Sequence, residues 1–302
     1  MKAIGVYSAR VRVEEKQIIA AVGDAGCLAV PVLPASMPLP PGPASPHQAM
    51  LGDVRNGSSD EGTQVPLDVI IDRCTNRAVA GVSLQLARLG GVAVIDAGLA
   101  ATGSRVAVAS ALERAGIPRP ASMVGFSEAS SVDAAGHLGY PVTLFGLVPG
   151  TSSTPLQDAD TADAVIEHRV VLGDDSEAIV LIQAGAPDPG ERSLVHVVGG
   201  AAIATAGISV DAVGLMLAER AAVALGAGFV TIELARTPSG LVVWDALPVV
   251  DFRQAAPVGE MSVAGAIASL ALKASSNPVN GRSDGGQATL VGEVRRDFAL
   301  SA

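Results

Sequence analysis

Phe229-Val230-Thr231-Ile232-Glu233-Leu234 and Leu241-Val242-Val243-Trp244-Asp245 are two apolar runs of strand length, separated by a short turn. β-Branched and aromatic residues, which favour strands, make up most of both runs. The two runs therefore predict a pair of neighbouring strands. Each strand carries one carboxylate, Glu233 on the first and Asp245 on the second.

The chain before this pair alternates between strand-like and helix-like segments. The first segments are the strands Ala3–Tyr7, Leu28–Leu33, Leu67–Asp72 and Val92–Ile95 and the helices Val13–Gly23 and Val79–Leu89. Such alternation predicts a parallel sheet with helices on both faces. Residues 34–66 are rich in Pro, Gly, Ser and Asp without hydrophobic periodicity, which predicts an exposed loop.

Further elements are expected between residues 98 and 274. The predicted helices are Gly103–Ala115, Ser130–Leu138, Asp160–His168, Asp211–Leu225 and Val263–Leu272, and the predicted strands are Ala121–Gly125, Val142–Phe145, Ala178–Gln183, Leu194–Val198 and Ala201–Thr205. The last two strands form a hairpin around Gly199-Gly200. Residues 275–302 begin as a polar linker, which predicts a tail or an arm that docks on a neighbour.

The composition is typical of a globular protein with an extensive core. The chain has 302 residues, of which 49% are hydrophobic and 17% charged, so length alone suggests two or three domains. Only 3% of the residues are aromatic, which predicts a core of small branched side chains. A formal net charge of −10 opposes binding to nucleic acid and to anionic membranes, so we expect any partner surface to be basic or apolar.

Neither the apolar runs nor the N-terminus indicates a membrane protein. The runs are of strand length, well short of the roughly 20 residues that a spanning helix needs. The segment Met1–Tyr7 has the pattern of a first strand and lacks the features of a signal peptide, so we expect a cytoplasmic protein. Cys27 and Cys74 lack the spacing of a zinc site, which predicts buried free thiols.

Several local phrases occur in an order that points to a known family. They are Arg10-Val11-Arg12-Val13-Glu14-Glu15-Lys16, Asp72-Arg73-Cys74, Ala101-Thr102-Gly103-Ser104-Arg105, Glu113-Arg114-Ala115-Gly116-Ile117-Pro118, Leu138-Gly139-Tyr140-Pro141-Val142-Thr143-Leu144-Phe145, Leu181-Ile182-Gln183, Val197-Val198-Gly199 and the two runs quoted first. In order and spacing they resemble the ATP-grasp superfamily, specifically its RimK/LysX branch of carboxylate–amine ligases, up to about Leu272.

This resemblance implies a mixed α/β and α+β chain with the ATP-grasp fold. It implies a parallel N-terminal α/β domain over 1–97, a central lid domain over 98–183 and a C-terminal domain over 184–274, with 275–302 as linker and tail. It also implies joining of a carboxylate to an amine through an acyl phosphate, with ATP and Mg²⁺ held between two α+β domains. Electrostatic positioning carries most of such phosphoryl transfer, so the cations at the site decide the activity.

The phosphate-binding cations of the family are only partly present. No lysine occurs between Lys16 and Lys273. Where the family has a nucleotide-binding lysine at a helix start, this chain has Arg105, which keeps the charge. A solvated or salt-bridged arginine is the equally weighted alternative for that residue. The second lysine position holds Phe145, which cannot bind phosphate by charge.

Other family positions have changed as well. The loop over the phosphates becomes Pro149–Pro155, in which Ser152 and Ser153 are candidate anion ligands, although a plain surface turn is the more favoured interpretation. Gln183 is a candidate nucleotide contact, but the hinge after it is Ala184-Gly185-Ala186-Pro187. The family's substrate arginine falls on Leu194. The polar segment that would bind an acceptor substrate is missing, because Ala204-Thr205-Ala206-Gly207 runs almost directly into Asp211.

The metal site implied by the resemblance is half kept. Glu233 and Asp245 preserve two carboxylates, whereas the third ligand, an Asn in the family, is Leu247. Mg²⁺ prefers a near-octahedral shell of oxygen atoms, so two carboxylates alone make a poor site. The favoured alternative is a structural pair of carboxylates with one bonded to an arginine such as Arg253, and His196 is expected to be a core or surface residue.

These substitutions favour a degenerate ATP-grasp protein that acts by binding or assembly, as a homo-oligomer or in complex with an active homologue. ATP and Mg²⁺ binding is expected to be weak or absent. The alternative is an active ATP- and Mg-dependent carboxylate–amine ligase acting on an amino acid, peptide or carrier protein. A third class, a small-molecule sensor, would use Ser152, Ser153, Thr154 and Gln183. A cleft closed by Phe145 and Leu194 would favour the first.

Overall fold

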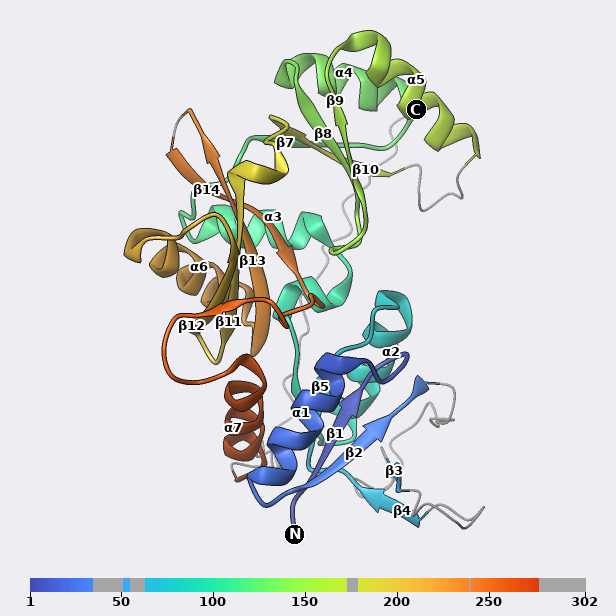
Figure 1. Ribbon diagram of the computed structural model, residues 1–302. Helices are drawn as coiled ribbons and strands as arrows, with labels where there is room; N and C mark the ends of the chain where they lie inside the picture. The colour runs from blue at the N-terminus through green and yellow to red at the C-terminus, as the bar shows by residue number, and fades with distance from the viewer. Residues whose placement is uncertain (35–50, 55–62, 173–178, 239, 277–302) are drawn as a thin grey trace, which may run out of the picture.

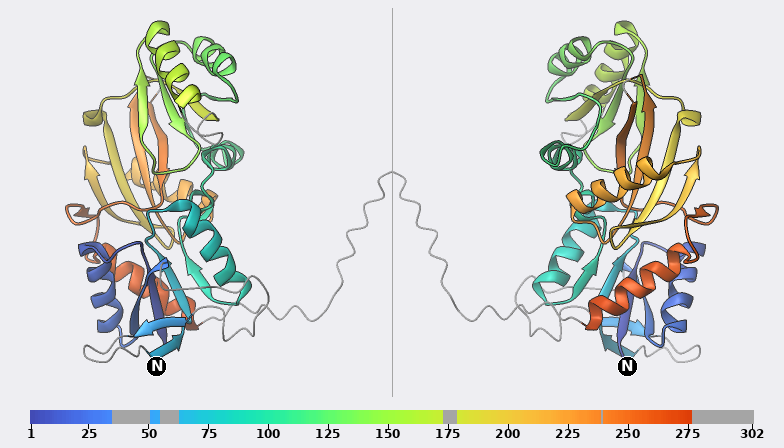
Figure 2. Two further views of the ribbon diagram at one scale, coloured as in Figure 1. Left: turned by 90° about the vertical axis from the view of Figure 1, so that its right-hand side faces the viewer. Right: turned by 90° about the vertical axis from the view of Figure 1, so that its left-hand side faces the viewer.

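The computed structural model describes residues 1–34, 51–54, 63–172, 179–238 and 240–276. In Figures 1 and 2 the described chain forms three units stacked along one direction, with the N-terminal unit at one end and the lid at the other. The C-terminal sheet lies between them.

The N-terminal unit is a parallel sheet with the order β2-β1-β5-β6. Its elements are β1 (Ala3–Tyr7), α1 (Val13–Asp24), β2 (Leu28–Val32), β5 (Val69–Asp72), α2 (Arg77–Leu89) and β6 (Ala93–Ile95). Helices α1 and α7 (Val263–Ser276) pack on the face that buries Ile4 and Ile71, whereas α2 packs on the face that buries Tyr7 and Ile70. The predicted parallel sheet with helices on both faces is confirmed.

Part of the range predicted as a loop forms strands. Strands β3 (Leu51–Val54) and β4 (Thr63–Pro66) pair antiparallel, so the prediction of loop structure throughout 34–66 is wrong for these segments. The two strands are four residues each and lie between Pro- and Gly-rich segments, so the alternation of apolar and polar residues is too short to indicate a strand. The prediction for 35–50 and 55–62, and that for 277–302, lies outside the described residues.

The lid is an antiparallel sheet with the order β7-β10-β8-β9. Its elements are β7 (Ser122–Gly125), α4 (Glu128–Leu138), β8 (Val142–Gly146), β9 (Ser153–Leu156), α5 (Ala159–Leu172) and β10 (Val180–Ala184). Leu144 and Ile182 face the core under α4 and α5, and the alternate residues Phe145 and Leu181 face the opposite side. Strand β9 corrects the favoured interpretation of Pro149–Pro155 as a plain turn, because Ser153 already pairs with Phe145.

The C-terminal unit is an antiparallel sheet with the order β14-β13-β11-β12-β15. Its elements are η3 (Pro189–Glu191), β11 (Arg192–Val198), β12 (Ala201–Gly207), α6 (Ala212–Leu225), β13 (Phe229–Thr237), β14 (Gly240–Leu247) and β15 (Ala256–Pro257). One core joins its strands to α6, α3 (Arg105–Arg114) and the short helix η2 (Gly98–Thr102). The predicted domain boundaries stay a prediction.

Strands β13 and β14 place their carboxylates opposite each other. Glu233 pairs with Asp245 in the ladder, and a register shift follows between Glu233 and Leu234, which pairs with Val243. Trp244 is thus the extra residue of a β-bulge, a feature that re-aims side chains locally. The predicted strand pair is confirmed.

Two other predictions can be compared with the described residues. Cys27 and Cys74 are both free and buried, as predicted. Every helix in the described part of the chain is too short or too polar to cross a membrane.

Candidate functional site

The lid sheet and the C-terminal sheet meet at an apolar cluster. Phe145 and Leu181 from the lid pack against Ala235, Val242 and Trp244 from β13 and β14. The Phe145 and Trp244 ring centroids are 6.1 Å apart with a tilted geometry, and both side chains are buried. Side chains therefore fill the cleft between the two sheets at this point.

Arg105 closes the same cleft by an ion pair. Ser104 caps α3 by accepting a hydrogen bond from the Ala107 N–H at 3.1 Å, which fixes Arg105 at the first helical position. The Arg105 side chain is 3% exposed and reaches Asp245 through Nη2–Oδ2 (2.7 Å) and Nε–Oδ2 (3.2 Å). Its guanidinium also lies over the Phe145 ring, 4.6 Å from the centroid.

The remaining donors of Arg105 hold the loop after β8. Nη1 donates to the carbonyl oxygens of Gly146 (2.7 Å) and Val148 (2.8 Å) and to Thr151 Oγ1 (3.1 Å). Nη2 also donates to the Thr151 carbonyl at 3.2 Å. All three guanidinium nitrogens thus have protein acceptors. The loop that would lie over a phosphate is tied to the residue expected to bind it.

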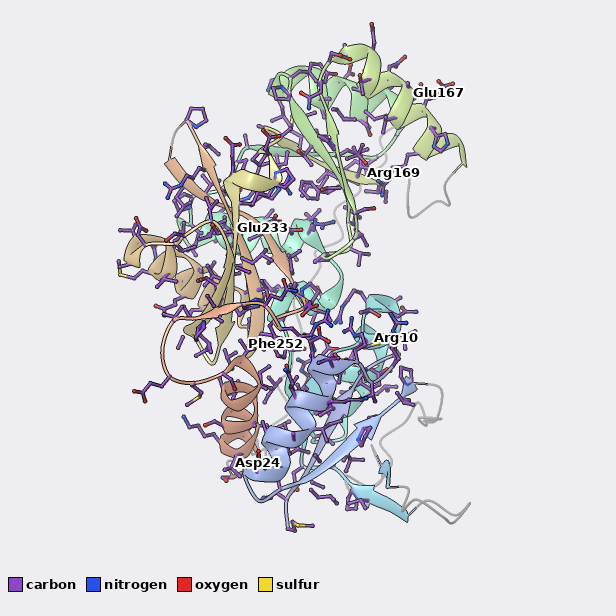
Figure 3. The ribbon with its side chains drawn as sticks, in the orientation of Figure 1. Arg10, Asp24, Glu167, Arg169, Glu233 and Phe252 are labelled. Carbon is purple, nitrogen blue, oxygen red and sulfur yellow. The ribbon has the colours of Figure 1, made fainter. Side chains whose placement is uncertain are left out.

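Glu233 has its own arginine. Arg192 Nη1 lies 3.3 Å from Glu233 Oε1, and its guanidinium lies 5.6 Å from the Trp244 ring centroid. Arg192 also donates from Nε (3.1 Å) and Nη2 (2.8 Å) to the Pro187 carbonyl in the hinge. Burial raises the pKa of Glu233, and the Arg192 charge offsets part of that rise. Figure 3 labels Glu233 on the C-terminal sheet at the side of the lid.

The space left between these groups is small. A cavity of about 20 Å³ is lined by residues that include Arg105, Phe145, Gln183, Trp244 and Asp245. This volume holds one or two water molecules. Ligand pockets in proteins usually have about 300–1,000 Å³, so a nucleotide does not fit without movement of the two sheets.

His196 lies in the core beneath the site. Its Nδ1 is 2.8 Å from Thr231 Oγ1, and its ring makes an edge contact with Phe252. Burial lowers the pKa of His196 to about 4, with a smaller contribution from the nearby Arg73 charge. Figure 3 shows Phe252 where the C-terminal sheet meets the N-terminal unit. His196 is therefore a core residue, which is one of the two placements expected from the sequence.

Solved structures with a similar fold are known. A RimK-domain ATP-grasp protein from Sphaerobacter thermophilus has a TM-score of 0.71 and 29% identity, covering 89% of this chain and 99% of its own. This chain has the ATP-grasp fold. The ATP-grasp ligase PsnB in complex with minimal precursor, Mg and ADP has a TM-score of 0.60 and 13% identity, with 91% and 98% coverage.

More distant ATP-grasp structures also match. D-alanyl-alanine synthetase A from Vibrio cholerae has a TM-score of 0.59 and 12% identity, covering 92% of this chain and 98% of its own. At that identity the likeness concerns the fold alone. No family model matches the sequence.

The carboxylates of this chain do not fit Mg²⁺ in their described arrangement. Asp245 pairs with Arg105 and Glu233 pairs with Arg192. The arginines therefore occupy the carboxylate oxygen atoms that a metal ion would need as ligands, and their positive charge repels a cation. In the described part of the chain, no group of three or more His, Cys, Asp or Glu residues could hold a metal ion. Arg253 pairs with Glu14 and Asp251 instead, so its suggested bond to these carboxylates is wrong.

The structure brings only some predicted site residues together. Arg105, Gln183 and Asp245 line the small cavity, and Gln183 Nε2 donates to the Trp244 carbonyl at 3.2 Å. Ser152 is exposed and Ser153 half-buried on the loop and strand beyond it, and neither lines that cavity. Their roles as ligands, like that of Glu233, stay predictions.

Two residues of the site were not among the sequence candidates. Arg192 lies two positions before Leu194, so strand periodicity places both on one face and could have identified Arg192 as a replacement for the family's arginine. Trp244 adjoins Asp245, but its packing against Phe145 depends on the β-bulge. The residues around Trp244 carry no sequence signal for that bulge.

Proposed function

We propose that this ATP-grasp protein lacks ligase activity and acts by binding or assembly. The observation that supports the proposal is the state of Arg105, whose guanidinium holds Asp245 and the 146–151 loop through protein groups alone. A nucleotide phosphate would have to displace these bonds to reach Arg105. The positive charge of Arg105 thus balances the negative charge of Asp245 inside the protein.

The energetic cost of opening this site supports weak nucleotide binding. Breaking a buried ion pair costs about 3–5 kcal/mol, which corresponds to about two to four orders of magnitude in affinity. Moving Phe145 away from Trp244 would add the cost of exposing two buried aromatic rings. We therefore propose that Mg²⁺·ATP binds weakly or not at all.

Ligase activity is the second candidate. It is favoured by the likeness to a RimK-domain protein over nearly the whole of that chain, and by the Mg and ADP of the PsnB complex. A second cavity, of about 350 Å³, could also hold part of a ligand. It lies between the N-terminal end of α2, at Asn76 and Arg77, and the loop Pro149–Thr151. An active ligase would require Arg105 and Arg192 to release both carboxylates when nucleotide binds.

The proposed partner is a second copy of the chain or an active ATP-grasp homologue. The net charge of −10 favours a basic or apolar partner surface. Light scattering of the full chain would measure self-association, and co-purification with a RimK-like homologue would measure the mixed complex. A monomer that associates with neither would contradict the assembly role.

Calorimetry with Mg²⁺·ATP tests the loss of activity. The full chain, Arg105→Ala and the exposed control Arg114→Ala would be titrated at equal concentrations, with circular dichroism to confirm folding. We expect no saturable heat from the wild-type chain up to about 1 mM nucleotide. Saturable binding that Arg105→Ala abolishes and Arg114→Ala retains, with release of ADP in the presence of an amine and a carboxylate, would overturn the proposal.

A further inference from the structure

A third and larger cavity adjoins the hinge between the lid and the C-terminal sheet. This hinge pocket has a volume of about 760 Å³, in the range of pockets that hold small molecules. It shares only Arg119 and Trp244 with the small cavity at Asp245. The hinge pocket is therefore separate from the closed cleft.

The walls of the hinge pocket are mainly apolar. They include Pro120, Ala121, Pro141, Pro187, Val242 and Trp244. The Ala184-Gly185-Ala186-Pro187 hinge, made of small residues, forms one side. Small residues at the hinge leave room, and the part of the largely buried Trp244 ring that lines the pocket adds apolar surface.

The charged groups of the hinge pocket favour an anion. Arg119, Arg236 and Glu191 line it, so its own charges sum to one positive in a chain whose net charge is −10. The Glu191 carboxylate already accepts a hydrogen bond from the Asp188 N–H at 3.2 Å. The two guanidinium groups are thus the more available polar partners.

Neither arginine has a close carboxylate partner among the described residues, although Arg119 Nη2 donates a hydrogen bond to Ser122 Oγ. The Arg119 side chain is only 12% exposed, and its one carboxylate neighbour, the largely exposed Glu113, lies 3.8 Å away. Burial lowers the pKa of Arg119, and Glu113 offsets part of this. Arg236 is exposed, and no carboxylate of the described chain pairs with it. Planar guanidinium groups bind carboxylates through two parallel hydrogen bonds.

We propose that the hinge pocket binds a small carboxylic acid with an apolar body. Arg119 and Arg236 hold the carboxylate, and the apolar part lies against Trp244 and Val242. A single carboxylate matches this charge. A triphosphate carries more negative charge than two arginines and one glutamate can balance.

The sole tryptophan of the chain gives a direct test, because Trp244 lines the pocket. The full chain would be titrated with phenylacetate, 3-phenylpropionate and hexanoate, and in parallel with neutral phenylacetamide, following Trp244 fluorescence and calorimetric heat. We expect at least one acid to bind with a Kd of about 1 mM or lower, and the amide about ten-fold more weakly than phenylacetate.

Substitutions of two pocket residues, with one control outside the pocket, distinguish binding in the hinge pocket from unspecific binding. Arg236→Gln should weaken acid binding about ten-fold, whereas Arg220→Gln, on the exposed face of α6, should leave it unchanged. Ala186→Phe, which fills the pocket from the hinge, should abolish binding without unfolding the chain. No saturable response to any acid, equal binding of acid and amide, or full binding by Arg236→Gln would each overturn the proposal.

Discussion

Arg105 and Asp245 are 140 positions apart in the chain, and their side chains form a two-nitrogen ion pair inside the closed cleft, with Nη2–Oδ2 at 2.7 Å and Nε–Oδ2 at 3.2 Å. Both side chains are almost fully buried, at 3% and 6% exposure. The residue predicted to bind nucleotide phosphate and a residue predicted to bind metal therefore pair with each other. Most of the predictions below, on stability and on nucleotide binding, follow from this ion pair.

Removing Arg105 should destabilise the protein strongly. Arg105→Ala leaves the Asp245 carboxylate buried without its partner, a change that costs about 3–5 kcal/mol in the free energy of unfolding. Urea denaturation would measure it, with Arg114→Ala, an exposed arginine of the same helix, expected within about 0.5 kcal/mol of wild type.

The double variant Arg105→Met/Asp245→Leu distinguishes charge from packing. Replacing both partners of a buried pair with apolar residues often restores stability. We expect the double variant to be more stable than Arg105→Ala. A double variant as unstable as the single one would show that the pair itself is not the source of the effect.

Phe145→Lys should restore an anion response at the cost of stability. The new ammonium would lie near the Arg105 guanidinium, which now rests 4.6 Å from the Phe145 ring centroid. Repulsion between the two cations should lower the free energy of unfolding by about 2–4 kcal/mol. Added ATP should then raise the melting temperature of Phe145→Lys and leave that of the neutral control Phe145→Met unchanged. Equal ATP responses in the two variants would contradict the prediction.

The fold was largely predictable because its signals are local. Strand-length apolar runs and helix starts such as Ser104-Arg105 are visible within a few residues. The opening strand pair, the Gly199-Gly200 hairpin and the parallel N-terminal sheet were all found in this way. The short strands β3 and β9 were not, because Pro and Gly interrupt their patterns.

The candidate site was predictable only in part, because its state depends on distant pairs. The sequence identified Arg105 and Asp245 as site positions but could not show that they bind each other across 140 residues. Arg253 was the suggested partner of a site carboxylate, whereas in the structure it pairs with Glu14 and Asp251. Arg192 carried a local signal, its two-residue spacing from Leu194.

Glu233→Gln should remove part of the pH dependence of stability. Burial raises the pKa of Glu233 in the folded protein, so the folded state binds its proton more tightly than the unfolded state does. This group's contribution is fully present below the unfolded pKa and is lost as the pH rises through the folded pKa. Relative to wild type, Glu233→Gln should gain stability across that window. Urea midpoints measured across about pH 4–8 would check it, and a constant difference would contradict it.

His196 should give the opposite pH dependence. Burial lowers the pKa of His196 from its ordinary value of 6.5 to about 4, with the Arg73 charge adding to the effect and the Asp251 charge opposing it. The unfolded chain therefore takes up a proton at a pH where folded His196 stays neutral. The stability associated with the neutral ring is complete above the unfolded pKa and decreases as the pH falls towards about 4.

This difference in pKa corresponds to about 3 kcal/mol of stability lost between those two pH values. His196→Asn keeps a polar atom near Thr231 Oγ1, which lies 2.8 Å from the His196 Nδ1, but it cannot titrate. We expect the variant to be less stable than wild type at neutral pH, because it leaves a cavity beside Phe252. The gap should narrow as the pH falls, because only the wild type loses stability through this ring. Urea midpoints of both proteins at matched pH values would measure the gap. A gap that stays constant down to about pH 4 would show that the ring protonates equally well in both states.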